Sequence, residues 1–118
     1  MPGLEKLPRR ERLTQRREYL AMYRSARRVQ GRAFVCYVAR RAGQGRKFGM
    51  AVSRKVGGAV VRNRVKRYIR EIYRTRRQGM DDDISIVIVA RPGSASLDFA
   101  QCADAIGQLL RKGEVLSG

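Results

Sequence analysis

The sequence has no histidine, only two cysteines and few acidic residues. Without histidine, the chain lacks the side chain that most often serves as a general base near neutral pH or as a zinc ligand. Cys36 and Cys102 are too few for a cysteine-rich zinc site or a disulfide scaffold, and we expect both to be reduced packing residues. We therefore expect no catalytic residue and no metal ligand in this chain.

Long apolar runs are also missing. No run approaches the roughly 18 residues of a membrane span, and residues 1–10 lack the apolar segment of a secretion signal. We expect a cytoplasmic protein with no membrane partner and no small-molecule substrate. The 118 residues, of which 43% are hydrophobic, are enough for one domain with its own core.

What the sequence has in excess is positive charge. It contains 27 Lys and Arg against 10 Asp and Glu, a formal net charge of +17. Residues 1–77 carry a net charge of +20, and residues 78–118 carry −3. Such an uneven distribution predicts a basic face that attracts nucleic acid. The alternative is that the charge serves only solubility.

Composition and periodicity divide the chain into a basic flexible arm (1–12), a folded domain (13–113) and a short tail (114–118). A first helix is expected from Thr14, as N-cap, to Gly31. The further elements expected are strands at 33–39 and 46–53, a helix at 59–77, a strand at 84–90 and a helix from Ser96 to Gly113. The last helix has an apolar stripe of Phe99, Cys102, Ile106, Leu109 and Leu110.

The fold class that follows is α+β. We expect a single compact domain in which a small β-sheet packs with about three helices. The order is α-β-β-(β)-α-β-α, where the bracketed strand stands for a short extra strand near residues 52–56 that the pattern does not reveal.

The expected helix at 59–77 has two different sides. Its apolar side is expected to dock on the sheet and contains Val61, Val65, Tyr68, Ile69 and Ile72. Its basic side contains Arg62, Lys66, Arg67, Arg70, Arg74 and Arg77. Glu71 lies one helical turn from both Arg67 and Arg74, so it can order them by ion pairs. Arginine suits phosphate contacts, although a merely solvated face is the alternative.

The segment that leads into this helix is also basic. Arg54 and Lys55 precede Gly57 and Gly58, so backbone N–H groups at the helix start can receive a phosphate. A tight turn that lets the strand pack on the helix is an equal alternative, and both can hold together.

Residues 49–71, GMAVSRKVGGAVVRNRVKRYIRE, resemble the signature of the bacterial ribonuclease P protein subunit. The core of the motif is the triplet Arg62, Asn63 and Arg64, followed by Lys66, Arg67 and Arg70. The likeness extends over roughly residues 12–112, and it implies a ribosomal protein S5 domain 2-like fold.

This resemblance implies that the chain is the protein component of an endoribonuclease whose RNA subunit is the catalyst. The expected partners are that RNA and precursor tRNA, whose 5′ leader is removed with divalent metal, Mg²⁺, held mainly by RNA and not tightly by the protein. The residues expected to contact RNA are Arg54, Lys55, Arg62, Asn63, Arg64, Lys66, Arg67, Arg70 and Arg74.

The resemblance also implies a cleft for the single-stranded leader between the first helix and the sheet. The matching positions are Tyr19, Tyr23 and Tyr37, with Phe34 as a floor. Aromatic platforms beside positive charge bind single strands with little sequence preference. The alternative is that these aromatic residues belong to an ordinary core.

A different class of function remains open at this point: a non-catalytic ribosomal or nucleoid-type protein that uses the same basic face. A free-standing nuclease is poorly supported, because carboxylates are sparse outside Asp81, Asp82 and Asp83.

Overall fold

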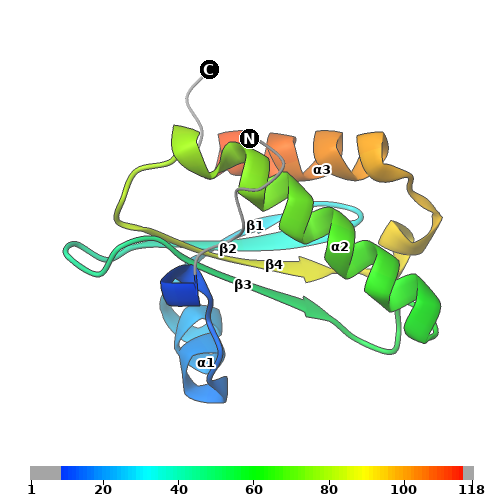
Figure 1. The fold of residues 1–118 in the computed structure, drawn as a ribbon, viewed down its shortest axis with the longest axis horizontal. Helices are drawn as coiled ribbons and strands as arrows, with labels where there is room; N and C mark the ends of the chain where they lie inside the picture. The colour runs from blue at the N-terminus through cyan, green and yellow to red at the C-terminus, as the bar shows by residue number, and fades with distance from the viewer. Residues whose placement is uncertain (1–8, 116–118) are drawn as a thin grey trace.

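The computed structural model describes residues 9–115. A four-stranded sheet has α2 and α3 on one face and the shorter α1 on the other (Figure 1). The elements are α1 (Arg16–Ser25), β1 (Arg27–Gln30), β2 (Phe34–Arg40), β3 (Lys47–Val52), α2 (Ala59–Arg76), β4 (Ile84–Ala90) and α3 (Phe99–Lys112), with short 3-10 turns η2 (Arg9–Glu11), η3 (Arg77–Gly79) and η4 (Pro92–Ser96). The predicted α+β fold class is confirmed.

The strand order is β1-β2-β4-β3, so β1 and β3 are the edges. β2 is antiparallel to β1 and β4, whereas β3 and β4 are parallel and connected through α2. β4 is buried along nearly its whole length, as its continuous apolar sequence predicts.

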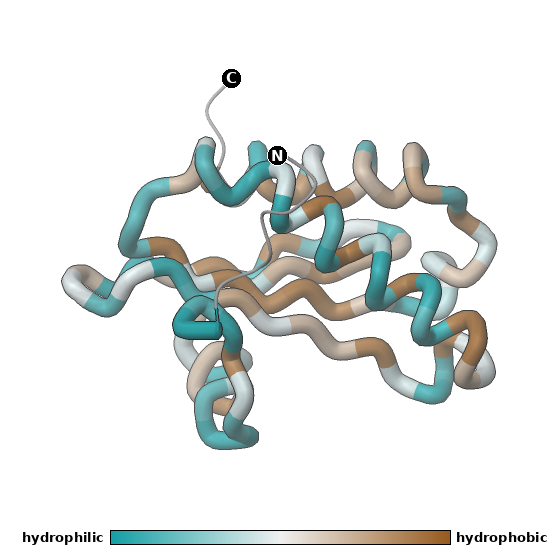
Figure 2. Tube along the Cα trace, in the orientation of Figure 1, coloured by the Kyte–Doolittle hydropathy of each residue, from teal (hydrophilic) through white to brown (hydrophobic). Residues whose placement is uncertain are grey.

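The main core lies between the sheet and the α2–α3 layer. Ile86 of β4 and Val65, Ile69 and Ile72 of α2 have no exposed surface. Figure 2 shows the hydrophobic segments of the strands facing those of the two helices. The helical period of α2 therefore docks it on the sheet, as expected from the sequence.

The extra strand and the helix starts differ from the expectation. The additional strand is β1, not a segment near residues 52–56; only Val29 of β1 is buried, so it lacks an apolar pattern.

The first helix ends at Ser25 instead of continuing to Gly31. Its N-cap is Gln15, not Thr14, because Gln15 forms a capping box with Glu18. In α3 the cap is Asp98, not Ser96, for the same reason: Asp98 and Gln101 form a capping box. Both caps are set by local hydrogen bonds, which the periodicity of apolar residues does not predict.

The boundaries of the domain are wider than predicted. Residues 1–8 and 116–118 lie outside the described residues. Residues 9–12, expected in a flexible arm, pack on the domain: Glu11 is 3% exposed, and Arg12 forms a parallel bridge with Phe48. In the expected tail, Val115 is buried and its N–H donates to the Leu110 carbonyl. Among the described residues, no helix is long and apolar enough to cross a membrane.

Candidate nucleic-acid interface

The solvent side of α2 carries a row of basic side chains. Asn63, Arg67 and Arg70 are exposed, whereas Val65, Ile69 and Ile72 on the other side are buried. The remaining predicted contacts on this helix, Arg62, Arg64, Lys66 and Arg74, are half-buried. α2 thus has the two sides that the sequence predicts, and contact with RNA stays a prediction.

The two arginines of the Arg-Asn-Arg triplet point to different flanks of α2. Residues two apart lie about 200° apart around a helix, so Arg62 and Arg64 cannot share one patch. The Arg64 guanidinium donates a hydrogen bond to the Ala95 carbonyl of η4. The Nε atoms of both arginines are buried and have no hydrogen-bond partner among the described residues. Arg64 therefore ties α2 to the segment that leads into α3.

Glu71 pairs with only one of its two predicted partners. Its carboxylate accepts hydrogen bonds from Arg74, including a 3.1 Å contact from Nε. This bond lowers the pKa of Glu71 below its ordinary value. Arg67 instead lies over the ring of Tyr68, with 5.7 Å from the guanidinium carbon to the ring centroid. The guanidinium of Arg67 is exposed on this ring and can meet a phosphate.

The loop before α2 forms a turn that requires glycine. Gly57 has a φ of +157°, and a Cβ there would lie 3.0 Å from the Val61 side chain. The predicted tight turn is therefore present. Arg54 and Lys55 are exposed on this loop, and the first turn of α2 contains no acidic residue. Phosphate binding at this helix start stays a prediction.

Three tyrosines gather on the sheet face that α1 covers. The ring centroids of Tyr19 and Tyr23 are 6.4 Å apart, and those of Tyr23 and Tyr37 are 4.9 Å apart at 61°. Tyr23 is 37% exposed, whereas Met22 beside it is buried with Leu13 and Val87 in a small second core. We call Tyr19, Tyr23 and Tyr37 the tyrosine cluster. Tyr19 and Tyr37 pack against the second core, whereas the ring of Tyr23 is accessible.

The environment of the cluster keeps Tyr23 in its neutral form. Burial raises the pKa of its phenol, and the neighbouring hydroxyls of Tyr19 and Tyr37 raise it further. The hydroxyl is therefore protonated at neutral pH and can donate a hydrogen bond to a ligand.

Phe34 is not part of this cluster, and the expectation that it forms the floor of the cleft is wrong. Phe34 has no exposed surface and belongs to the main core beneath α2 and α3. Successive residues of a strand point to opposite faces, so Phe34 and Tyr37, three apart on β2, lie on different sides of the sheet. On the α1 side, Tyr19 and Tyr37 instead pack against the second core, which contains Val87 of β4.

Tyr19 closes the outer edge of β3. Its hydroxyl accepts a hydrogen bond from the Met50 N–H at 3.3 Å and donates one to the Leu13 carbonyl at 3.4 Å. Its ring lies so close to Gly49 that a Cβ on that residue would be 2.8 Å from ring atoms. Glycine at position 49 therefore lets the ring pack flat on the strand.

A hollow of about 330 Å³ lies where Tyr19 meets the basic side of α2. It is lined by Arg12, Leu13, Tyr19, Phe48, Gly49, Met50 and Arg70. Arg70, on the opposite flank of α2 from Arg64, thus faces the same space as a ring of the tyrosine cluster. The hollow connects two groups of residues that the sequence suggests separately.

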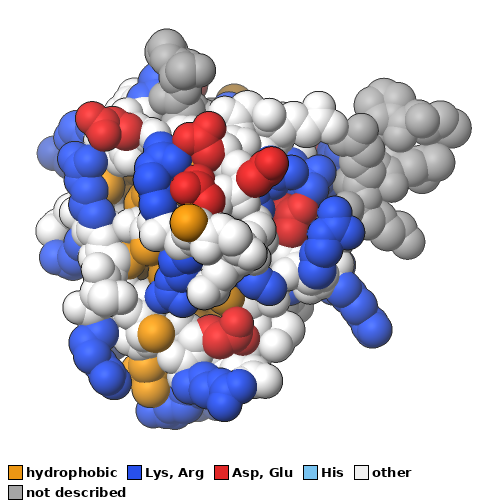
Figure 3. All heavy atoms as spheres, turned by 90° about the vertical axis from the view of Figure 1, so that its left-hand side faces the viewer, with side chains coloured by type: hydrophobic (Ala, Val, Ile, Leu, Met, Phe, Trp, Pro, Cys, Tyr) orange, Lys and Arg blue, Asp and Glu red, His pale blue; other side chains and the backbone are white. Residues whose placement is uncertain are grey.

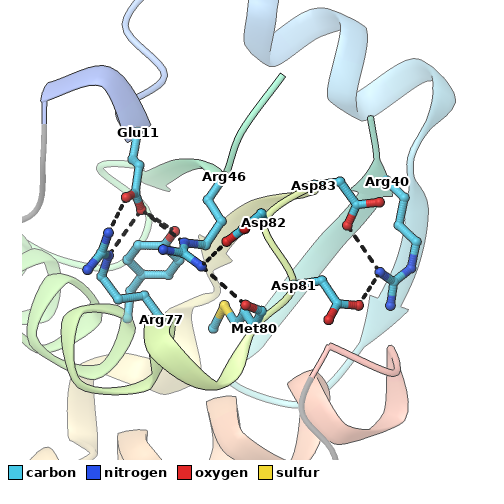
Figure 4. A network of polar contacts seen from close by, with 9 residues as sticks. Glu11, Arg40, Arg46, Arg77, Met80, Asp81, Asp82 and Asp83 are labelled. Carbon is cyan, nitrogen blue, oxygen red and sulfur yellow. Dashed lines mark hydrogen bonds and ion pairs between the residues drawn. The ribbon is translucent and has the colours of Figure 1, made fainter. Parts of the chain in front are cut away.

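The sequence patterns missed one polar network, built around Glu11 (Figure 4). The Glu11 carboxylate accepts hydrogen bonds from Arg77 and from the Tyr73 hydroxyl, at 3.1 Å each to Oε1, and lies 3.7 Å from Arg46 Nε. Burial by itself would raise the pKa of Glu11, but the hydrogen bonds from Arg77 and Tyr73 outweigh it and lower the pKa. Arg46 and Arg77 therefore contact Glu11 within the fold.

Three aspartates that follow α2 lie at the same end of the molecule as Glu11. Asp81 and Asp83 both pair with Arg40, and Asp82 pairs with Arg46 at 2.9 Å. Figure 3 shows acidic and basic side chains side by side over this end. In residues 9–115, no three His, Cys, Asp or Glu side chains come together to hold a metal ion.

The cysteines behave as packing residues, as expected. Both are buried, and neither forms a disulfide with a described residue. Burial raises the pKa of the Cys36 thiol to about 12, so it is neutral and unreactive.

Comparison with known proteins identifies relatives along almost the whole chain. A family model described as Ribonuclease P matches residues 7–114. The ribonuclease P protein component of Desulfovibrio desulfuricans is 46% identical over 110 residues, covering 90% of this chain and 85% of that protein. The corresponding protein of Dictyoglomus thermophilum is 35% identical over 117 residues, covering 97% of each chain.

Solved structures agree. The RNase P protein of Staphylococcus aureus matches with a TM-score of 0.84 at 25% identity, covering 91% of this chain and 98% of that one. The RNase P protein of Thermotoga maritima matches with a TM-score of 0.77 at 28% identity, covering 92% and 99%. The resemblance of the motif at residues 49–71 thus extends to sequence and fold as a whole.

Proposed function

Because the chain belongs to the family of bacterial ribonuclease P protein components, we propose that it binds both the catalytic RNA of that enzyme and the 5′ leader of precursor tRNA. In this role it assists the metal-dependent removal of the leader, while the RNA supplies the catalyst. The protein positions the substrate and performs no proton transfer of its own.

The single observation that carries the proposal is the hollow between Tyr19 and Arg70. In this hollow Tyr19, one member of the tyrosine cluster, lies beside Arg70 from the basic side of α2. A leader strand that stacks on the accessible ring of Tyr23 can then run past Tyr19 toward Arg70. Stacking contributes roughly 1–3 kcal/mol per base and depends little on sequence, which suits leaders of varied sequence.

The exposed cations contact RNA in this proposal. Arg67, Arg70, Arg54 and Lys55 meet phosphates, and Asn63 between them offers both a donor and an acceptor. Arg64 acts differently, because its guanidinium is bound to the Ala95 carbonyl and so fixes η4. Its contribution to RNA binding is through the shape of the surface.

A divalent metal held by RNA would supply the activation of water and the stabilisation of the leaving oxygen. The carboxylates of Asp81, Asp82 and Asp83 are engaged with Arg40 and Arg46 in this proposal and do not bind that metal. The basic surface instead offsets the repulsion between substrate and catalytic RNA, so its effect is greatest when Mg²⁺ is scarce.

The test is cleavage of precursor tRNA by a bacterial ribonuclease P RNA at low Mg²⁺, with and without the protein. Added protein should speed cleavage and favour leader-bearing substrate over leaderless product. If it does neither, the proposal fails. Crosslinking in a cell lysate gives an independent check: recovery of chiefly ribosomal RNA or chromosomal DNA would favour the ribosomal or nucleoid-type alternative.

Paired variants separate the two surfaces. Tyr23→Ala should reduce leader discrimination and spare binding of the catalytic RNA, whereas Arg67→Ala, outside the hollow, should weaken binding of the catalytic RNA. Binding should also fall steeply with salt, about 10³- to 10⁵-fold between 50 and 200 mM if about 6–10 phosphates are neutralised. A shallow salt dependence would contradict an interface built on phosphate contacts.

A further inference from the structure

A second aromatic pair lies on the other side of the sheet, between α2 and α3. The rings of Tyr68 and Phe99 meet edge to face, with centroids 5.5 Å apart and planes at 79°. Tyr68 is half-buried against the main core. Phe99 is 40% exposed, although the apolar stripe of α3 predicts it to be buried like Cys102 and Ile106. A large ring is thus left open to solvent where the sequence pattern predicts burial.

The surroundings of this pair are basic. Val60, Arg64, Arg67 and Tyr68 follow one another at helical spacing on one side of α2. Val60 is 82% exposed, and the guanidinium of Arg67 lies over the Tyr68 ring. The combination of exposed apolar groups with arginine is typical of surfaces that bind unpaired nucleotides.

The nearest acidic side chains are already engaged. Asp98, which precedes Phe99, accepts a 2.8 Å hydrogen bond from the Gln101 N–H as the cap of α3. Glu71 pairs with Arg74. The exposed guanidinium of Arg67 therefore remains the group on this surface that is placed to receive a phosphate.

The pair is far from the tyrosine cluster. α3 begins at the end of the sheet away from α1 and on its opposite face (Figure 1). A leader strand on Tyr23 does not reach Phe99, so the two aromatic groups serve different nucleotides.

We propose that Phe99, supported by Tyr68, stacks on an unpaired base of the catalytic RNA, and that Arg67 holds the adjacent phosphate. This inference rests on the proposed function, because it takes the catalytic RNA as the partner. Charge decides between RNA and a protein partner: the chain carries a net charge of +17, and the apolar rings are set among arginines. Phe99 is 40% exposed beside Tyr68, so part of its ring is open to a base.

The first test removes the ring and keeps an apolar side chain. Phe99→Leu should weaken binding of a bacterial ribonuclease P RNA about 5- to 150-fold, the range for the loss of one stacked base. Phe99→Trp, which retains a stacking surface, should restore binding. Leader discrimination should stay as in the wild type, and urea unfolding should show that both variants are folded.

The second test detects the contact directly. The chain has no tryptophan, so the F99W variant carries a single indole. Its fluorescence should change on addition of the catalytic RNA and stay constant with a leader oligonucleotide alone. Y23W is the matched control and should respond in the opposite way.

The outcomes separate this inference from the proposed function. If wild-type protein binds and assists the catalytic RNA while Phe99→Leu binds equally well, only the inference is overturned. An F99W signal that ignores the catalytic RNA at saturation would overturn it as well. If wild-type protein does not bind the RNA at all, both proposals fail.

Discussion

The two faces of the sheet carry different kinds of surface, although the same strands build both. On β2, Phe34, Cys36 and Val38 face α2 and α3 and are fully enclosed in the main core. Tyr37 and Ala39 face α1, whose ten residues leave part of this side accessible. One strand thus contributes one set of residues to the closed core and the alternate set to the more open face.

The helices packed on each face of the sheet decide which aromatic rings remain exposed. Phe34 is the more hydrophobic ring and has no exposed surface, whereas Tyr23 is 37% exposed and keeps a hydroxyl at the rim. An amphipathic ring suits a boundary between core and solvent. The face with one short helix is therefore the one on which a tyrosine ring stays partly exposed.

The sharpest test of this difference removes one ring from each face. Phe34→Ala should lower the free energy of unfolding by about 3–5 kcal/mol, because it leaves a cavity in the closed core. Tyr23→Ala should lower it far less, since its ring is partly in solvent already. Urea denaturation measures both. Equal losses would mean that the two faces share the stabilising role.

A second substitution tests the N-terminal segment, which lies beside the edge strand β3. Glu11→Gln should cost about 1.5–3 kcal/mol of stability, since it weakens the hydrogen bond from charged Arg77 and removes the ion pair with Arg46. Arg40, paired with the exposed Asp81, offers a control: Arg40→Gln should have a much smaller effect.

The same carboxylate predicts a pH dependence. The pKa of Glu11 in the folded protein lies below its ordinary value of 4.5, so its stabilisation is fully present above that pH. It is lost as the pH falls through the lower folded value. Unfolding measured from pH 7 to 3 should show an acid loss that the Glu11→Gln variant lacks; identical curves would contradict this role.

Gly49→Ala tests how the open face is held against the edge strand. The new Cβ would meet the Tyr19 ring, and such overpacking should cost about 1–3 kcal/mol. In a Tyr19→Leu background the same change should cost less, because the ring is gone. A double-mutant cycle measures the difference. Purely additive effects would show that Tyr19 does not restrict position 49.

The smallest expected effect concerns the hydroxyl of Tyr37. The ring contacts Tyr23, whereas the hydroxyl makes no hydrogen bond to residues 9–115. Tyr37→Phe should change stability by less than about 0.5 kcal/mol and leave leader discrimination intact. Loss of discrimination in this variant would identify the hydroxyl, and not the ring, as the contact with the leader.

The sequence predicts the elements whose pattern is strong and local. α2 and β4 follow from helical spacing and from a continuous β-branched run, and both lie close to the expected positions. The turn at Gly57 is of the same kind, since a glycine before a helix signals a special backbone conformation. Each of these signals is contained within a few neighbouring residues.

Features that depend on distant residues were missed or misplaced. β1 has a single buried residue, Val29, and forms only because β2 is beside it. Glu11 meets Arg77 across 66 residues of chain, a distance that no periodicity covers. The placement of Phe34 beside Tyr37 is a different kind of error, because the alternation of side chains along one strand already separates residues three apart.

The closed edge of β3 has a consequence for the protein at high concentration. An open edge strand can pair with the edge of a second chain and start aggregation. Here the Phe48 carbonyl is taken by the Leu13 N–H and the Met50 N–H by the Tyr19 hydroxyl. On the other edge, β1 presents the exposed Arg27 and Arg28, whose like charges repel a copy of the same strand. Both edges of the sheet thus disfavour pairing between copies of this chain.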